Sequence, residues 1–185
     1  MYRLSLIPTL LLLAACQTVN LDRDFDPDRD FASYRTWSWS SPRLQYQPDD
    51  PRLKSDLTDQ RIAEAVAEQL DQRGLRPAAQ DAKSDLKVRT WLIVDERERQ
   101  VTTGYTPMWG GYWNNYWAIP AYSETRTVQY KVGTLQVDLI DSEDGKLVWR
   151  GSAEQIMRSD PPSPHERAQA IRETVAKVLS QYPPR

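Results

Sequence analysis

The sequence of 185 residues contains a single cysteine, Cys16, and a single histidine, His165. One histidine excludes a zinc site built on two histidines, and one cysteine excludes an internal disulfide. A Gly-rich phosphate-binding loop and a Gly-x-Ser-x-Gly elbow are also missing, since Ser152 lies in a pattern typical of a strand. Because no catalytic constellation is recognisable, we expect a protein that is not an enzyme and that holds no cofactor or metal.

An excess of basic charge is missing as well. The net charge is −2, and it becomes −3 without residues 1–15, which carry only Arg3. This balance argues against a nucleic-acid partner. The longest apolar stretch, residues 4–13, is also too short for a membrane-spanning helix, which needs about 20 apolar residues. The remaining 170 residues, 16–185, are enough for one domain with a core.

The N-terminus resembles a bacterial lipoprotein signal. Arg3 supplies the positive charge, residues 4–13 form the apolar region, and Ala14 and Ala15 are the small residues that precede Cys16. The resemblance implies that cleavage falls before Cys16. It also implies that the cysteine sulfur carries a diacylglycerol and that the new amino group carries a fatty acid such as palmitate.

A lipidated Cys16 would anchor the protein to a membrane. Three acyl chains hold a protein durably, whereas a single myristoyl chain binds only marginally. Gln17 follows where an aspartate commonly retains lipoproteins at the inner membrane, so the resemblance favours the outer membrane, with the domain facing the periplasm. The expected partners are the membrane itself and a protein or cell-wall component of the envelope.

Alternation of apolar and polar residues predicts five strands. They are residues 18–24, 36–40, 85–95, 125–141 and 147–155. The three prolines of residues 42–51 predict a loop. Within residues 125–141 the apolar positions change from even to odd numbers at Gly133, which predicts a β-bulge at this glycine.

Two amphipathic helices are predicted, one from about Ser55 to Gly74 and one that begins after Ser163. Ser163 and Glu166 form a capping-box pattern around a proline. Small residues at 151 and 153 leave room for a helix to approach the sheet. Because helices and strands are segregated, the sequence predicts an α+β fold with a mainly antiparallel sheet of about five strands and two helices on one face.

The order and spacing of several segments resemble domain-of-unknown-function family 4136 (DUF4136), a group of Gram-negative envelope lipoproteins. The segments are residues 19–22 with Asp24 and Phe31, 34–39, 61–70, 74–75, 85–88, 133–141, 146–153 and the closing helix to Pro183. This resemblance covers nearly all of residues 16–185. It implies the α+β architecture and an envelope location, and it transfers no catalytic residue, since the family has no established activity.

No charged residue occurs between Arg99 and Glu124, and this stretch, expected to be an aromatic-rich loop at about 100–124, joins the two longest predicted strands. Its aromatic residues are Tyr105, Trp109, Tyr112, Trp113, Tyr116, Trp117 and Tyr122. Three interpretations remain open. The rings fill a small core over the sheet, form a docking surface for a protein or glycan, or contact the membrane interface.

Acidic residues occupy every second position from Asp22 to Asp30, a spacing that invites a calcium site. An EF-hand that starts at Asp22 would place Pro27 at its glycine position and Ser33 at its bidentate glutamate. The run is therefore predicted to be a solvated strand edge and turn, residues 141–145 an ordinary acidic hairpin turn, and His165 an exposed residue.

The sequence thus predicts a lipid-anchored envelope protein with a non-catalytic binding or scaffolding role. The alternative is a cell-wall or glycan-binding module that uses the aromatic residues.

Overall fold

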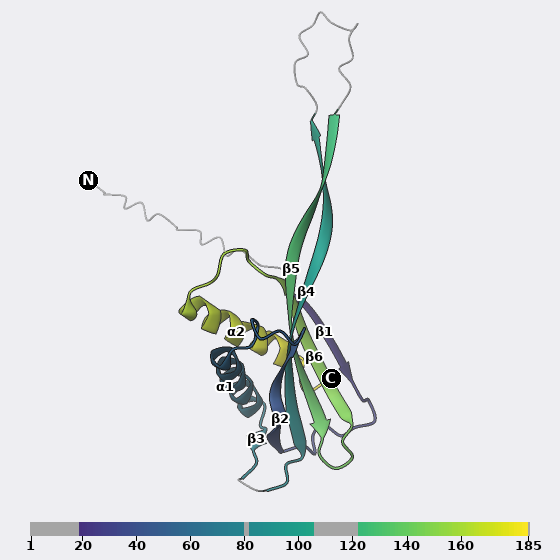
Figure 1. The fold of residues 1–185 in the computed structure, drawn as a ribbon. Helices are drawn as coiled ribbons and strands as arrows, with labels where there is room; N and C mark the ends of the chain where they lie inside the picture. Colours follow the sequence, from purple (N-terminus) through teal and green to yellow (C-terminus); the bar gives the residue numbers. More distant parts are fainter. Residues whose placement is uncertain (1–18, 80–81, 106–121, 185) are drawn as a thin grey trace, which may run out of the picture.

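The computed structural model describes residues 19–79, 82–105 and 122–184. This part of the chain forms one six-stranded sheet and two helices (Figure 1). The elements are β1 (Asn20–Phe25), β2 (Thr36–Gln47), α1 (Asp56–Gln72), β3 (Arg76–Pro77), β4 (Leu86–Tyr105), β5 (Tyr122–Asp141), β6 (Leu147–Ile156) and α2 (Pro164–Leu179).

The sheet is mixed, with the strand order β1-β6-β5-β4-β2-β3. β1, β6, β5 and β4 pair antiparallel, whereas β2 runs parallel to both β4 and β3. The parallel pairing arises because α1 carries the chain from β2 back to the start of β3 and β4. The predicted α+β class is confirmed, but the sheet has six strands and is less purely antiparallel than predicted.

β2 is longer than predicted, so the assignment of residues 42–47 to a loop is wrong. Trp39 pairs with Val88 and Leu44 pairs with Thr90, so that four residues of β2 face one residue of β4. Pro42 lies within this irregular stretch, where its missing N–H removes no ladder hydrogen bond. The strand therefore continues beyond a proline that, from sequence, indicates its end.

The predicted bulge at Gly133 is also wrong. The β4–β5 register runs without a shift through the pair Val94 and Gly133, and the irregularity of β5 lies instead between Leu139 and Ile140, in its pairing with β6. The change from even to odd apolar positions has another cause. From residue 135 to residue 139, the odd-numbered side chains of β5 face the helices and are apolar. Before residue 132 the strand extends beyond the core, and its odd-numbered positions are polar.

Both predicted helices are confirmed with their caps. Ser55 accepts a hydrogen bond from the Thr58 N–H, and Gly74 follows α1 with a positive φ of 84°. Ser163 and Glu166 form the complete capping box of α2. These local signals fix the helix ends because each satisfies backbone groups that the helix itself leaves unpaired.

The two helices lie on the same face of the sheet (Figure 1), where they pack on each other and α2 packs on β5 and β6. The largest fully buried side chains are Trp149, Ile62, Leu70, Leu86, Leu139 and Leu179. Tyr182, just after α2, meets Trp149 and Phe31 edge to face, with ring centroids 5.6 and 5.9 Å away. No helix of the described residues is long and apolar enough to cross a membrane.

Candidate functional site: the protruding ribbon

β4 and β5 extend far beyond the rest of the sheet. Their pairing runs from Leu86 and Asp141 to Tyr105 and Tyr122 without interruption. β2 stops opposite Ile93. On the other side β6 stops opposite residue 132. Residues 96–105 and 122–131 therefore form a two-stranded ribbon of ten residue pairs that projects from the domain (Figure 1).

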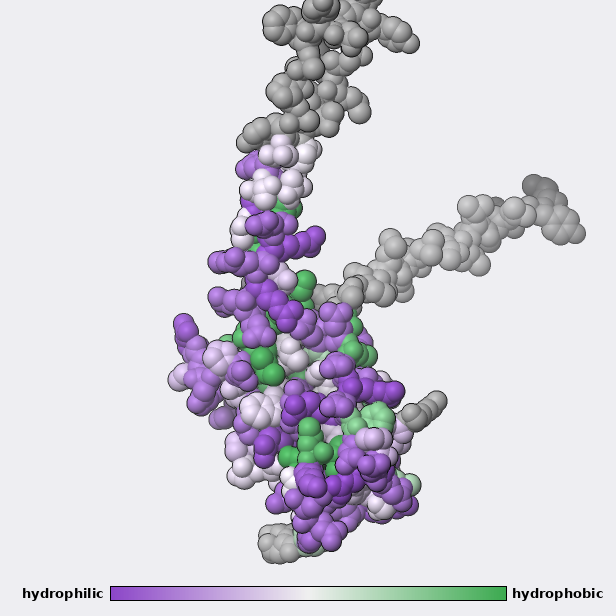
Figure 2. Space-filling model, turned by 90° about the vertical axis from the view of Figure 1, so that its right-hand side faces the viewer, coloured by the Kyte–Doolittle hydropathy of each residue, from purple (hydrophilic) through white to green (hydrophobic). Residues whose placement is uncertain are grey.

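One face of the ribbon is wholly polar and is held together by cross-strand contacts. Lys131 forms an ion pair with Glu96 at 3.2 Å, and the Gln129 amide donates to Glu98 at 3.1 Å. The hydroxyl oxygens of Thr102 and Thr125 lie 2.9 Å apart. An isolated two-stranded hairpin is marginally stable in water, so these pairs help to hold the ribbon in register. Figure 2 shows that the ribbon surface is largely hydrophilic.

The other face, which we call the arginine face, carries three arginines with Val101, Val128, the half-buried Tyr130, Thr103 and Glu124. Near its base, the Arg97 guanidinium donates to both carboxylate oxygens of Glu154 at 2.9 and 2.6 Å, which ties the ribbon to β6. This ion pair raises the pKa of Arg97 and lowers the pKa of Glu154.

Further out, the arginine face forms a square of four side chains. Arg99 lies opposite Val128, and Val101 lies opposite Arg126. The two arginines therefore occupy one diagonal, and the two valines occupy the other. Diagonal neighbours on a β-ladder are about 7–8 Å apart, within reach of long side chains. The arrangement places two guanidinium groups on a small, partly apolar patch.

β1 begins at the end of the sheet from which the ribbon projects. Asn20 pairs with Glu154, Glu154 pairs with Thr134, and Thr134 pairs with Ile93, just before the ribbon starts. Figure 1 shows that β1 starts on the side of the ribbon and that its arrowhead points away from the ribbon. The sequence leaves this relationship open, because it depends on strand direction and register.

The aromatic candidates can be placed only in part. Tyr105 and Tyr122 form the last backbone pair of the ribbon, so residues 100–105 and 122–124 are strand rather than loop. The other candidates, Cys16, Trp109, Tyr112, Trp113, Tyr116 and Trp117, lie outside the described residues.

A polar cluster lies at the opposite end of the sheet. Arg29 forms ion pairs with Asp26, Asp141 and Asp144, and the Tyr34 hydroxyl donates to Asp141 at 2.8 Å. Hydrogen bonds with Asp144 and Asp26 raise the pKa of Arg29, and the Arg29 guanidinium holds the pKa of Asp144 below its usual value. A cavity of about 500 Å³ opens beside these residues, and two of the charged residues that line it, Arg29 and Asp141, form an ion pair with each other.

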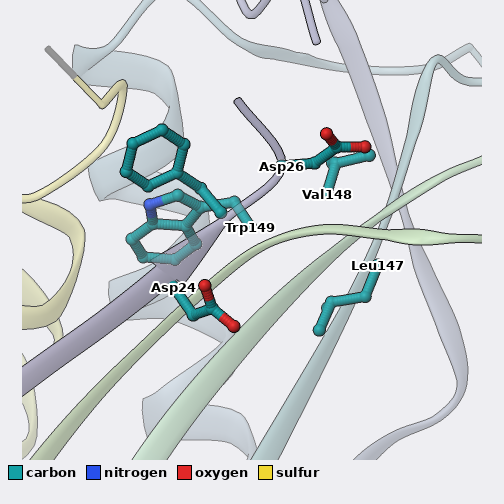
Figure 3. A pocket seen from close by; sticks show the side chains of 6 residues that line it. Asp24, Asp26, Leu147, Val148 and Trp149 are labelled. Atoms are coloured by element: carbon teal, nitrogen blue, oxygen red, sulfur yellow. The ribbon is translucent and has the colours of Figure 1, made fainter. Parts of the chain in front are cut away.

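A smaller cavity of about 280 Å³ lies between β1 and the start of β6 (Figure 3). The Asp26 N–H donates to the Val148 carbonyl oxygen at 3.0 Å, and its carboxylate is occupied by Arg29. Asp24, Leu147 and other side chains complete the wall. Within the described residues, no three histidine, cysteine or acidic side chains could together hold a metal ion.

The acidic run at Asp22–Asp30 follows the predicted pattern of strand edge and turn. Asp22 and Asp24 are exposed on the edge strand β1. Asp26 and Asp30 accept backbone hydrogen bonds from the turn residues two positions later. His165 is exposed in the first turn of α2, as predicted.

On the sheet face away from the helices, Asp138 is only 3% exposed and accepts four hydrogen bonds from three side chains. Arg150 donates two of them at 2.7 and 2.9 Å, the Trp91 indole N–H donates at 3.1 Å, and Gln136 donates at 3.0 Å. The carboxylate is fully used by these donors. These hydrogen bonds join β4, β5 and β6 on the sheet face away from the helices.

The geometry thus defines a class of protein, a small α+β domain with a long hairpin ribbon beside its N-terminal strand. The chain belongs to the family described as Domain of unknown function (DUF4136), whose sequence model matches residues 21–184. A comparison with curated proteins found no match.

A solved structure with a TM-score above 0.5 shares the fold. A PDZ domain protein from Parabacteroides distasonis is 17% identical with a TM-score of 0.56, over 91% of this chain and 36% of that one. The chain thus spans about a third of that protein. A DUF4136 family protein from Bacteroides thetaiotaomicron is 18% identical with a TM-score of 0.49, over 89% of this chain and 96% of that one.

Proposed function

We propose that this is a lipid-anchored envelope protein that acts by binding or scaffolding, with Cys16 as the anchor at the outer membrane and the domain facing the periplasm. The observation that carries the proposal is that Asn20, the first residue of β1, lies at the end of the sheet from which the ribbon projects. An anchor four residues before Asn20 would bring that end of the sheet to the membrane. The ribbon would then present its contacts close to the lipid surface.

A binding role is supported by how four carboxylates of the described residues are used. The carboxylates of Asp26, Asp141 and Asp144 pair with Arg29, and the buried Asp138 pairs with Arg150. Such pairing occupies the carboxylates, whereas a general acid or base needs a free group with a pKa near the working pH. These groups act in the fold.

The uncharged stretch between Arg99 and Glu124 is the second support. Tyrosine and tryptophan dominate the energetics of binding surfaces, and both also favour the membrane interface. Seven of them follow each other here without an intervening charge. A glycan of the cell wall is the alternative partner, since sugar rings stack on aromatic faces.

The anchor is tested by expressing the full chain in a Gram-negative host with a palmitate analogue. The expected result is an acylated N-terminal peptide that begins at Cys16, found by mass spectrometry in the outer-membrane fraction. Cys16→Ser is the control and should abolish both labelling and cleavage. An unmodified Cys16 in the wild-type protein would overturn the anchor.

The binding role is tested in cells by crosslinking from a photoreactive residue at Thr103, on the ribbon. Lys87, exposed near the other end of β4, is the matched control position. A protein or cell-wall adduct formed from Thr103 alone would identify the partner. Equal adducts from both positions would argue against the ribbon as the binding element.

A further inference from the structure

The chain segment that joins the anchor residue Cys16 to β1 is much shorter than the ribbon. From Cys16 to Asn20 the chain spans at most about 14 Å. From the level of Asn20, which is also the level of Ile93, β4 continues for twelve residues to Tyr105 at the end of the ribbon, or about 40 Å. A ribbon that pointed straight at the membrane would therefore enter it. This step rests on the proposed lipid anchor at Cys16.

The ribbon is unsuited to the hydrocarbon core of a membrane. Glu96, Glu98, Arg99, Glu124 and Arg126 are all exposed on it. Both outer edges of the ribbon also lack a neighbouring strand in the described residues, and unpaired backbone groups are very costly in lipid. A ribbon that cannot insert, yet starts within reach of the membrane, is best accommodated along the headgroups.

The two faces of the ribbon differ in their suitability for this contact. On the polar face, Lys131 is paired with Glu96, and Glu98 is bonded to Gln129. On the arginine face, Arg97 is paired with Glu154, whereas no ion pair of Arg99 or Arg126 occurs in the part of the chain that the structure describes. Glu124, exposed on the same face, leaves this face with a net positive charge. Two adjacent, unpaired guanidinium groups repel each other unless an anion lies between them.

We propose that Arg99 and Arg126 bind the phosphate groups of an anionic phospholipid surface. Guanidinium groups bind phosphate through paired, charge-assisted hydrogen bonds. Val101, half buried, and Val128, 38% exposed, occupy the other diagonal of the same square and would meet the headgroup boundary. The arginine face would thereby hold the ribbon flat on the membrane.

The test places an environment-sensitive fluorophore at Thr103→Cys, an exposed position on the arginine face, in the full-length protein. The protein is mixed with vesicles of phosphatidylcholine, with or without phosphatidylglycerol. We expect a blue shift and quenching by headgroup nitroxides only with phosphatidylglycerol, and a loss of both at high salt. Arg99→Glu with Arg126→Glu should weaken this association about 30-fold or more, since each arginine near an anionic surface contributes about fivefold.

Two further variants make the result decisive. Arg99→Gln with Arg126→Gln removes the charges without adding repulsion beside Glu98 and Glu124, and should also lose the response. Lys83→Glu with Lys146→Glu makes the same change in net charge as the arginine-to-glutamate pair, but on exposed residues at the far end of the sheet, and should keep the response.

Several outcomes would overturn the proposal. They are an equal response to both lipids, a response that survives in the glutamine variant, or an equal loss in the lysine variant. A response to purified cell wall in place of vesicles would also overturn it. Mass spectrometry of the N-terminal peptide reports the anchor separately, and vesicles added to protein without acyl chains still test the ribbon alone.

Discussion

Gly151 of β6 lies against Val178 of α2 so closely that a Cβ at position 151 would be 3.0 Å from the Val178 Cγ1 atom. It would also lie 2.8 Å from Cζ2 of Trp149, a fully buried side chain. The absence of a side chain on Gly151 therefore leaves room for the Trp149 ring first and for Val178 of α2 as well. The sequence predicts this close approach from the small residues at 151 and 153.

Gly151→Ala should consequently destabilise the domain. Overpacking a well-filled core costs about 1–3 kcal/mol, and the buried Trp149 has little room to move. Urea unfolding measures the change in free energy. Gly133→Ala is the matched control, because a Cβ at Gly133 meets only the flexible Met157 side chain, at 3.4 Å or more. A loss of stability in Gly133→Ala as large as that in Gly151→Ala would contradict the argument.

Tyr182→Phe should leave the stability unchanged or raise it by up to about 1 kcal/mol at neutral pH. The Tyr182 hydroxyl is buried without a hydrogen-bond partner in the described part of the chain, and a buried unsatisfied hydroxyl is destabilising. The ring contacts with Phe31 and Trp149 survive the change. Thermal unfolding measures the effect, and a clear loss of stability would mean that the hydroxyl has a partner.

The same substitution should alter alkaline unfolding. Burial raises the pKa of Tyr182 to about 12, from an ordinary value of 10. The folded state therefore holds its proton while the unfolded chain loses it, so stability falls as pH rises from 10 to 12, by on the order of 2 to 3 kcal/mol. Tyr34, also raised to about 12, keeps its own contribution. Tyr182→Phe should show a shallower decline than wild type, and identical curves would refute this.

Local signals in the sequence predict the elements well. The capping box at Ser163 and Glu166 fixes the start of α2, and strict alternation predicts the first half of β4. Pairing is a non-local property and is harder to predict. The parallel pairing of β2 with β4 depends on the crossover through α1. At Gly133, the change of the apolar positions from even to odd numbers fits a β-bulge as well as it fits a strand that extends beyond the core.

The candidate site illustrates the same limit. The sequence identifies the uncharged aromatic stretch and the anchor residue Cys16 as candidates. The second half of β4 buries no face in a core, so its sequence shows no apolar alternation, and the ribbon cannot be recognised. Arg99 and Arg126 become neighbours only through a register that pairs residues 29 positions apart in sequence, Arg99 with Val128.

Arg150→Ala should be strongly destabilising compared with Arg97→Ala. Both arginines bind a carboxylate through two hydrogen bonds, but Asp138 is 3% exposed, whereas the Arg97 pair lies at the surface. Removing Arg150 leaves a buried carboxylate without its ion-pair partner, which costs about 3–5 kcal/mol in fully buried pairs and less here, because the Arg150 side chain is itself 42% exposed. Urea unfolding of the two variants measures the difference, and equal effects would contradict it.

Asp85→Asn should weaken the domain at neutral pH and flatten its acid unfolding. The Asp85 carboxylate accepts hydrogen bonds from the backbone N–H groups of Arg35 and Thr36 at 2.9 and 2.8 Å, which join the start of β2 to β4. These bonds lower the pKa of Asp85 below its ordinary value of 3.8. The stabilisation is therefore complete above that value and is lost as pH falls through the lower pKa of the folded state. Thermal unfolding between pH 2 and pH 7 should show a smaller loss of stability on acidification in Asp85→Asn than in wild type, while an unchanged pH dependence would show that Asp85 does not contribute to it.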